Sequence, residues 1–158
     1  MDIALKDEKA TTVFAQQLAS VLQAGDVVML YGDLGAGKTF LARALINALS
    51  KTPQEVPSPT FTLVQCYDTK NMEIWHFDLY RLEHADEVVE LGWDEALGSA
   101  LLLIEWPDRL GHLRPEDRLE INLKINPDYT GQRKLAITAH GAYTQRKELL
   151  LQGWEAPL

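Results

Sequence analysis

The sequence predicts an α/β domain of three layers, in which helices cover a mixed, mostly parallel β-sheet that includes an antiparallel hairpin. Short apolar runs at 27–31 and 101–104 have the length and composition of buried strands. Apolar residues at helical spacing precede and follow the first of these runs. Because the 158 residues contain no repeat, low-complexity stretch or linker, we expect a single domain over residues 1–158.

The first third of the chain predicts a helix, a strand and a second helix. Residues 9–23 carry apolar side chains on one helical face, with Thr11 and Thr12 as possible caps. Gly25 and Asp26 end this pattern and lead into the strand 27–31. A glycine-rich loop follows, and the next helix has its apolar face at Leu41, Ala44, Leu45, Ala48 and Leu49.

The rest of the chain predicts a pair of strands, an interrupted helix, two further strands and a closing helix. These segments are 61–67, 73–80, 83–97, 119–125, 135–139 and 143–152. The polar link 68–71 is too short for a crossover, so the first two strands are antiparallel. Gly92 interrupts the helix.

Composition narrows the function classes. Acidic residues outnumber basic ones by 23 to 15, which gives a net charge of −8. A free-standing nucleic-acid binder usually has a basic surface, so a partner would hold any nucleic acid. The single cysteine, Cys66, allows no intramolecular disulfide, and neither a signal peptide nor an apolar run of about 20 residues is present. We therefore expect a cytoplasmic protein that does not enter a membrane.

The glycine-rich loop carries the strongest signal of function. Residues 32–39, Gly-Asp-Leu-Gly-Ala-Gly-Lys-Thr, fit the pattern G-x-x-x-x-G-K-[ST] between a strand and a helix. In such a loop the backbone N–H groups surround phosphates at the positive end of the helix. Lys38 can reach the β- and γ-phosphates, and the Thr39 hydroxyl can join a Mg²⁺ shell. The nucleotide-binding residues predicted for this P-loop NTPase domain are Gly32, Gly35, Ala36, Gly37, Lys38, Thr39 and Phe40.

A loop of this kind needs an acidic residue that holds the ion or orients water. Glu105 directly follows the apolar run 101–104 and is the leading candidate for catalysis and for the metal; the alternative is a solvated glutamate at a strand end. Asp78 is the second catalytic candidate. Strand alternation places it on one face with His76 and Tyr80, which either lines a site or is an exposed polar face.

Two more groups complete the candidate site. Ser58, Thr60, His76, Tyr80 and Trp106 form the predicted switch and coupling set. Thr60 is expected to become ordered only when a γ-phosphate is present, and Trp106, directly after Glu105, is expected to transmit changes at the metal site. The alternative is a Ser-Pro turn before a strand and a tryptophan that packs in the core.

For the nucleoside, the Thr11 hydroxyl and the planar Arg133 cation are candidate contacts. Helix capping and a solvated turn are the respective alternatives.

Taken together, these motifs resemble the TsaE family, the bacterial ATPases of tRNA threonylcarbamoyladenosine biosynthesis. The resemblance covers roughly residues 10–140 and combines the phosphate loop with Ser-Pro-Thr-Phe at 58–61, His-Phe-Asp-Leu-Tyr-Arg at 76–81 and Glu-Trp at 105–106. The phosphate loop alone is shared by many proteins, whereas the combination is much more specific.

The resemblance implies a Mg²⁺-dependent ATPase that acts with TsaD and TsaB on adenosine next to the anticodon. It implies that TsaD transfers the threonylcarbamoyl group, while ATP hydrolysis here resets the complex. The tRNA would be contacted through these partners, which suits the acidic charge of this chain.

The residues alone are also compatible with two other functions. A small-molecule or nucleoside kinase can share this size and loop, but such enzymes need arginines that clamp the migrating phosphoryl group. Residues 52–80 contain only Lys70 as a basic residue, so a clamp would have to come from Arg109, Arg114 and Arg118. The other possibility is a nucleotide-gated binding module that hardly hydrolyses.

Overall fold

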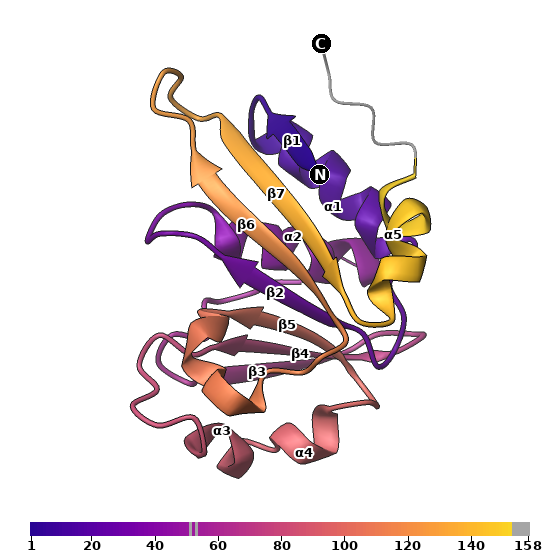
Figure 1. The fold of residues 1–158 in the computed structure, drawn as a ribbon, viewed down its shortest axis with the longest axis vertical. Coiled ribbons are helices and arrows are strands. Elements are labelled where there is room, and N and C mark those ends of the chain that lie inside the picture. Colours follow the sequence, from indigo (N-terminus) through magenta and orange to yellow (C-terminus); the bar gives the residue numbers. More distant parts are fainter. Residues whose placement is uncertain (51, 53, 153–158) are drawn as a thin grey trace.

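A seven-stranded sheet forms the centre of the computed structural model, which describes residues 1–50, 52 and 54–152 (Figure 1). The strands lie in the order β1-β7-β6-β2-β5-β4-β3. Their bounds are Asp2–Leu5 (β1), Val27–Tyr31 (β2), Val64–Asp68 (β3), Glu73–Asp78 (β4), Leu101–Glu105 (β5), Arg118–Ile125 (β6) and Arg133–His140 (β7). The helices are Glu8–Ala19 (α1), Lys38–Leu49 (α2), Glu87–Glu90 (α3), Trp93–Ala96 (α4), the 3₁₀ segment Pro107–Leu113 (η1) and Tyr143–Leu151 (α5).

The sheet is mixed, as expected. Its four central strands, β6, β2, β5 and β4, are parallel to one another. The hairpin β3–β4 and the pairs β6–β7 and β1–β7 are antiparallel. Five strands therefore point one way, and β7 and β3 point the other way. The parallel centre brings the carboxyl ends of β2, β4 and β5 to one edge, where sites form in open α/β sheets.

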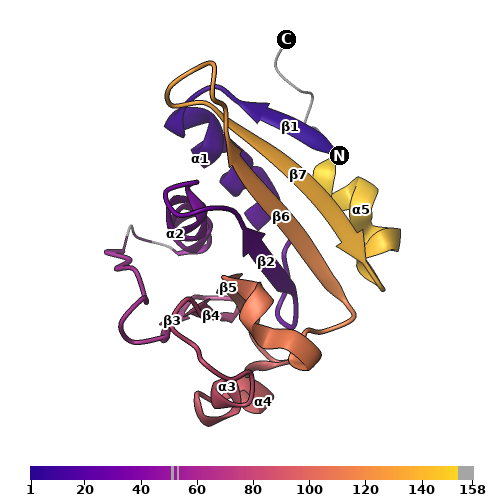
Figure 2. The ribbon, with the colours of Figure 1, turned by 60° about the vertical axis from the view of Figure 1, so that its left-hand side comes forward.

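Helices pack on the two faces of the sheet and enclose two apolar cores. Figure 2 shows α1 and α2 on one side of the strands. Their buried side chains, such as Phe14 and Leu41, share a core with Leu30 and Leu103. The opposite core lies against β2, β4 and β5 and takes its helical side chains from α3, α4 and η1, namely Val88, Trp93, Ala96 and Leu110. The three-layer prediction is thus confirmed.

Several local predictions differ from the structure. The first helix begins at Glu8, because the Asp7 carboxylate caps it by accepting from the Ala10 N–H at 2.8 Å. Thr11 and Thr12 therefore lie inside α1 and do not cap it. The strand β1 and the segment η1 were not predicted. Four residues of β1 are too few for a clear alternation, and residues 107–113 have no regular apolar spacing.

The hairpin begins later than predicted, at Val64 instead of residue 61. Residues 58–63 form a turn in which the Leu63 N–H donates to the Pro59 carbonyl oxygen at 2.7 Å. Leu63 has a φ of 66°, which an L-residue adopts at a cost. In turn, the Leu63 carbonyl accepts from the Asp78 N–H at 2.9 Å and fixes this turn to the end of β4.

The closing helix α5 is anchored at the opposite edge of the sheet, where the parallel strands begin, by a network of hydrogen bonds and an ion pair at the buried Asp26. The Asp26 carboxylate accepts from the Tyr143 hydroxyl at 3.1 Å and from both terminal nitrogens of Arg146, at 2.6 and 3.0 Å. The Tyr143 oxygen in turn accepts from the Val27 N–H at 2.7 Å. Burial raises the pKa of Tyr143 far above its usual value. Within the described part of the chain, every helix is too short or too polar to cross a bilayer.

Candidate nucleotide site

The predicted phosphate loop lies where β2 ends and α2 begins. Its turn is closed by the Ala36 N–H, which donates to the Asp33 carbonyl oxygen at 3.0 Å. Gly35 and Gly37 have φ values of 81° and 107°, and Gly37 directly precedes the first residue of α2. No side chain caps this helix, so its first N–H groups remain for an anion.

Gly32 meets a requirement of packing as well as of the loop. A Cβ atom at this position would lie 2.6 Å from the carbonyl oxygen of Leu123 on β6, and the φ of Gly32 is 146°. The backbone of β6 therefore passes too close for any side chain. The parallel pairing of β2 with β6 produces this contact.

Lys38 lies at the centre of the loop and is only 5% exposed. Its Nζ donates to the carbonyl oxygens of Gly32 and Asp33, at 2.5 and 3.0 Å, and lies 4.0 Å from the centroid of the Trp106 ring. Burial lowers the pKa of Lys38, whereas the carboxylates of Glu105 and Asp78 act in the opposite direction. The ammonium is thus held by contacts that phosphate oxygens can replace.

Glu105 ends β5 directly beside Thr39. The Thr39 hydroxyl donates to Oε1 of Glu105 at 2.6 Å, and the Nε2 atom of His76 lies 2.7 Å from Oε2. Glu105 is 2% exposed, so it is not a solvated strand-end glutamate. A hydroxyl and a carboxylate in contact are oxygen donors of the kind that Mg²⁺ prefers, and these residues fit that ion.

Asp78 is the neighbour of Glu105 across the parallel pair β4–β5. Its Oδ2 accepts from the Thr60 hydroxyl at 3.0 Å, and its Oδ1 accepts from the Tyr80 N–H at 3.1 Å. The Ser58 and Thr60 hydroxyls lie 2.7 Å apart. The turn 58–63 is thereby attached to the second acid of the site. Asp78 and His76 are both buried, so this face of β4 is not an exposed polar face.

Trp106 stands between two cavities. It has a left-handed backbone with a φ of 56°, and its ring lies 4.9 Å from that of Tyr80, centroid to centroid. On one side is a cavity of about 340 Å³ that contains most of the predicted site. Its lining residues are Leu34, Gly35, Gly37, Lys38, Thr39, Phe40, Ser58, Thr60, Asp78, Tyr80, Glu105 and Trp106.

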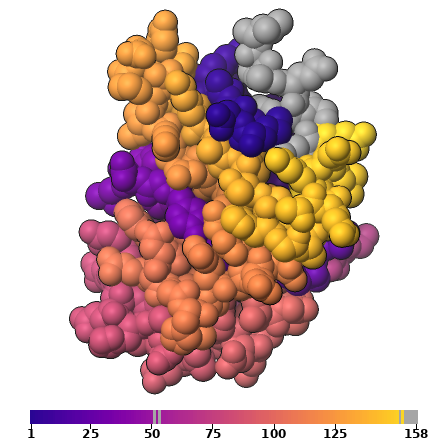
Figure 3. Space-filling view, viewed as in Figure 1, coloured from indigo at the N-terminus to yellow at the C-terminus, as the bar shows by residue number. Residues whose placement is uncertain are grey.

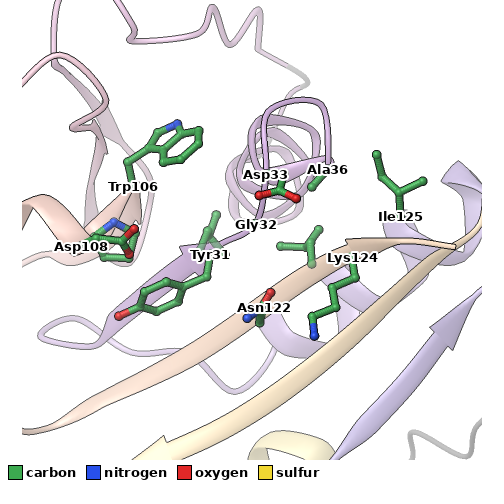
Figure 4. A pocket seen from close by; sticks show the side chains of 12 residues that line it. Tyr31, Gly32, Asp33, Ala36, Trp106, Asp108, Asn122, Lys124 and Ile125 are labelled. Atoms are coloured by element: carbon green, nitrogen blue, oxygen red, sulfur yellow. The ribbon is translucent and has the colours of Figure 1, made fainter. Parts of the chain in front are cut away.

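The second cavity is larger, about 490 Å³, and contains neither Thr39 nor an acid of β4 or β5. Figure 4 shows it over the end of β2, with Asp33 and Ala36 of the loop near its centre and Trp106 and Asp108 at one side. In the space-filling view of Figure 3 the violet atoms of the loop segment reach the surface between orange atoms above and below.

Sequence reasoning missed the residues that β6 adds to this second cavity, Asn122, Leu123, Lys124 and Ile125. They are about 90 positions away from the loop along the chain, and only the pairing of β2 with β6 brings them together. Strand alternation predicts that Asn122 and Lys124 share a face. It does not predict that β6 lies beside the phosphate loop.

The two candidate contacts for the nucleoside lie in different surroundings. The Nε atom of Arg133 donates to the Ala36 carbonyl oxygen at 2.8 Å, so Arg133 lies against the loop from the start of β7. Thr11 is 6% exposed, its hydroxyl donates to the Asp7 carbonyl oxygen at 3.3 Å, and it lines neither cavity beside Trp106.

The arginines of a kinase-like clamp do not converge on the site. Arg118 is 8% exposed and its Nε donates to Glu120 at 2.8 Å. Arg114 lines a separate cavity with Tyr31 and Glu120. Among the described residues, no arginine lines the cavity that contains Thr39 and Glu105.

Comparisons with known proteins show which family the chain resembles. The family profile described as "Threonylcarbamoyl adenosine biosynthesis protein TsaE" matches residues 5–135. The chain is 46% identical over 121 residues to a Rickettsia typhi protein named tRNA threonylcarbamoyladenosine biosynthesis protein TsaE, which covers 77% of this chain and 84% of the relative. A Bacillus subtilis protein of the same name is 36% identical over 143 residues, covering 90% of this chain and 85% of that protein.

A solved structure has the same fold. The crystal structure of Bacillus subtilis YdiB superposes with a TM-score of 0.78 and 29% sequence identity, over 96% of this chain and 91% of that chain. The profile covers the loop, both acids and Trp106, and the relatives match most of the chain. The chain therefore belongs to the TsaE family.

Proposed function

We propose that this protein is a Mg²⁺-dependent ATPase that acts in the cytoplasm, with TsaD and TsaB, in threonylcarbamoyladenosine modification of tRNA. The contact between the Thr39 hydroxyl and Glu105 carries the proposal, because it joins the phosphate loop to a buried acid. The names of the relatives support the biosynthetic process.

Different residues of the site bind the triphosphate and the metal ion in this proposal. Lys38 and the loop N–H groups bind the triphosphate, while Thr39 and Glu105 hold Mg²⁺, with Asp78 as a second ligand or a group that orients water. The ion, when bound, supplies charge neutralisation at the β- and γ-phosphates. Among the described residues no three acidic, histidine or cysteine side chains converge as a complete metal site. That suits Mg²⁺, which keeps waters and substrate phosphates as ligands.

In this proposal TsaD transfers the threonylcarbamoyl group to tRNA. ATP hydrolysis by this protein is therefore not needed to activate the substrate, and it resets the complex for the next cycle. The turn 58–63 and Trp106 border the cavity that contains Lys38. When ATP is exchanged for ADP, these segments change conformation and alter the surface that binds the partner proteins. Because the chain has a net charge of −8, the partners hold the tRNA.

The test is a reconstitution of the protein with TsaD, TsaB, tRNA and ATP. We expect phosphate release that requires Mg²⁺, together with modified tRNA that requires all three proteins. Nucleotide-dependent recovery of the partners without phosphate release would indicate a nucleotide-gated binding module. ATP consumption that depends on an added nucleoside or other small acceptor would indicate a kinase.

A further inference from the structure

His76 is a polar side chain inside an apolar core. It is 0% exposed, and its register partner on β5 is Leu103, a core residue. Ile74 precedes it on the same face of β4 and belongs to the same core. Because burying an imidazole without hydrogen bonds is costly, its position requires a specific partner.

That partner is Glu105, and the geometry selects one tautomer of the ring. Nε2 of His76 lies 2.7 Å from Oε2 of Glu105, whereas Nδ1 is buried and has no hydrogen-bond partner among the described residues. A proton on Nδ1 would be an unsatisfied buried donor and would leave a lone pair facing the carboxylate. The ring therefore carries its proton on Nε2 and donates it to Glu105.

The two oxygens of Glu105 have different donors. Oε1 accepts from Thr39 on α2, and Oε2 accepts from His76 on β4. Two donors on opposite oxygens fix both the position and the plane of the carboxylate. The Thr39 oxygen would hold an ion through a lone pair while its proton stays on Oε1, and the bond from His76 would fix the other oxygen of the carboxylate.

We propose that His76 is the positioning residue of the metal-binding acid: it holds Oε2 of Glu105 so that Oε1 faces Thr39 and the ion. The inference rests on the proposed Mg²⁺-dependent function. His76 does not line the cavity that contains Lys38 and Thr39, so it acts through Glu105 and does not touch the nucleotide.

This assignment differs from the coupling role that the sequence predicts for His76. A side chain with no exposed surface cannot contact a partner protein. Residues that orient metal ligands typically change metal affinity by roughly 10- to 100-fold when they are replaced. The expected signature is thus a change in Mg²⁺ dependence and not in the affinity for the free nucleotide.

The experiment compares His76→Gln, His76→Asn and His76→Leu. The Gln amide can place an N–H where Nε2 lies, the shorter Asn cannot reach that place, and Leu has no donor. Mg²⁺ is titrated by calorimetry into protein saturated with ADP, and ADP affinity is measured separately in a chelator. The control is Tyr143→Phe, which removes a buried hydroxyl at the opposite edge of the sheet.

In His76→Leu and His76→Asn we expect half-saturation at Mg²⁺ concentrations about tenfold higher or more, with ADP affinity in the chelator within about twofold of the wild type. His76→Gln should stay within about threefold of the wild type, and so should Tyr143→Phe. Wild-type Mg²⁺ affinity in a folded His76→Leu protein would overturn the proposal. So would a His76→Gln protein that is as impaired as His76→Leu.

A second measurement is independent of nucleotide and metal. Long-range ¹H–¹⁵N spectra of the wild-type protein report the imidazole tautomer, and we expect the Nε2–H form; the Nδ1–H form would overturn the proposal. If the wild type binds neither ADP nor Mg²⁺, the proposed ATPase function fails and the role at the metal fails with it. The spectra then still decide whether His76 donates to Glu105.

Discussion

The ammonium group of Lys38 lies 4.0 Å from the centroid of the Trp106 ring. This contact joins the phosphate loop to the residue that follows the buried acid of β5. Trp106 also contacts Tyr80, and it separates the cavity with the predicted site from the larger cavity beside it. A movement of Lys38 would therefore act directly on the Trp106 ring, which borders both cavities.

Replacement of Lys38 by alanine should weaken ATP binding strongly. The variant loses a charge-assisted contact to phosphate of about 1.5–3 kcal/mol, which is roughly 10- to 100-fold in affinity. Calorimetry measures this, with Lys70→Ala as the control, because Lys70 is exposed in the turn between β3 and β4 and does not line the cavities beside the loop. Unchanged affinity in a folded Lys38→Ala protein would refute the assignment of the loop.

Replacement of Glu105 by glutamine should preserve the fold and reduce hydrolysis by about an order of magnitude or more, because a charge at the metal is lost. Phosphate release under saturating ATP and Mg²⁺ is the measurement. Asp78→Asn, measured in parallel, tests the second acid. Full activity in Glu105→Gln combined with its loss in Asp78→Asn would assign the principal role to Asp78.

Replacement of Thr60 or Trp106 by alanine should leave ATP affinity nearly normal but abolish ATP-dependent recovery of TsaD and TsaB. Thr60 attaches the turn 58–63 to Asp78, and Trp106 contacts the loop lysine. The matched control is Thr62→Ala, an exposed hydroxyl in the same turn. If the folded Thr60 and Trp106 variants support normal tRNA modification, these residues have a structural role only.

Replacement of Arg133 by alanine should weaken nucleotide binding about tenfold, because the Ala36 carbonyl of the loop loses a charged donor worth about 1.5 kcal/mol. Lys134→Ala, an exposed base next in the chain, should bind normally. A structure with bound nucleotide tests the further proposal that Arg133 and Thr11 contact the nucleoside. A base located far from both residues would exclude it.

The stability of the protein should fall in alkaline solution, in part through Tyr143. Because burial raises the pKa of this tyrosine in the folded state, only the unfolded chain ionises near the ordinary value of about 10. Stability from this group is complete below that value and is lost as the pH rises further toward the folded pKa. Unfolding by urea between about pH 8 and 11 should show a steeper decline for the wild type than for Tyr143→Phe. Equal slopes would contradict the prediction.

The sequence was sufficient for features that a local pattern encodes. Residues 32–39 predicted the phosphate loop, and the abrupt end of an apolar strand predicted Glu105 beside it. The burial of His76 was not predictable, because alternation gives the faces of β4 but not what covers each face. The left-handed backbone of Trp106 and the cavity under β6 depend on contacts between distant segments, which spacing along the chain does not record.

Gly32 has a consequence for the design of mutants at this site. The first glycine of the motif is required by the carbonyl oxygen of Leu123, so even the small methyl group of alanine would push β2 and β6 apart. A Gly32 variant that fails to bind ATP would thus report a damaged sheet rather than a missing phosphate contact. Nucleotide-free reference proteins are better made at Lys38, where the side chain alone is changed and the backbone of the two strands can keep its spacing.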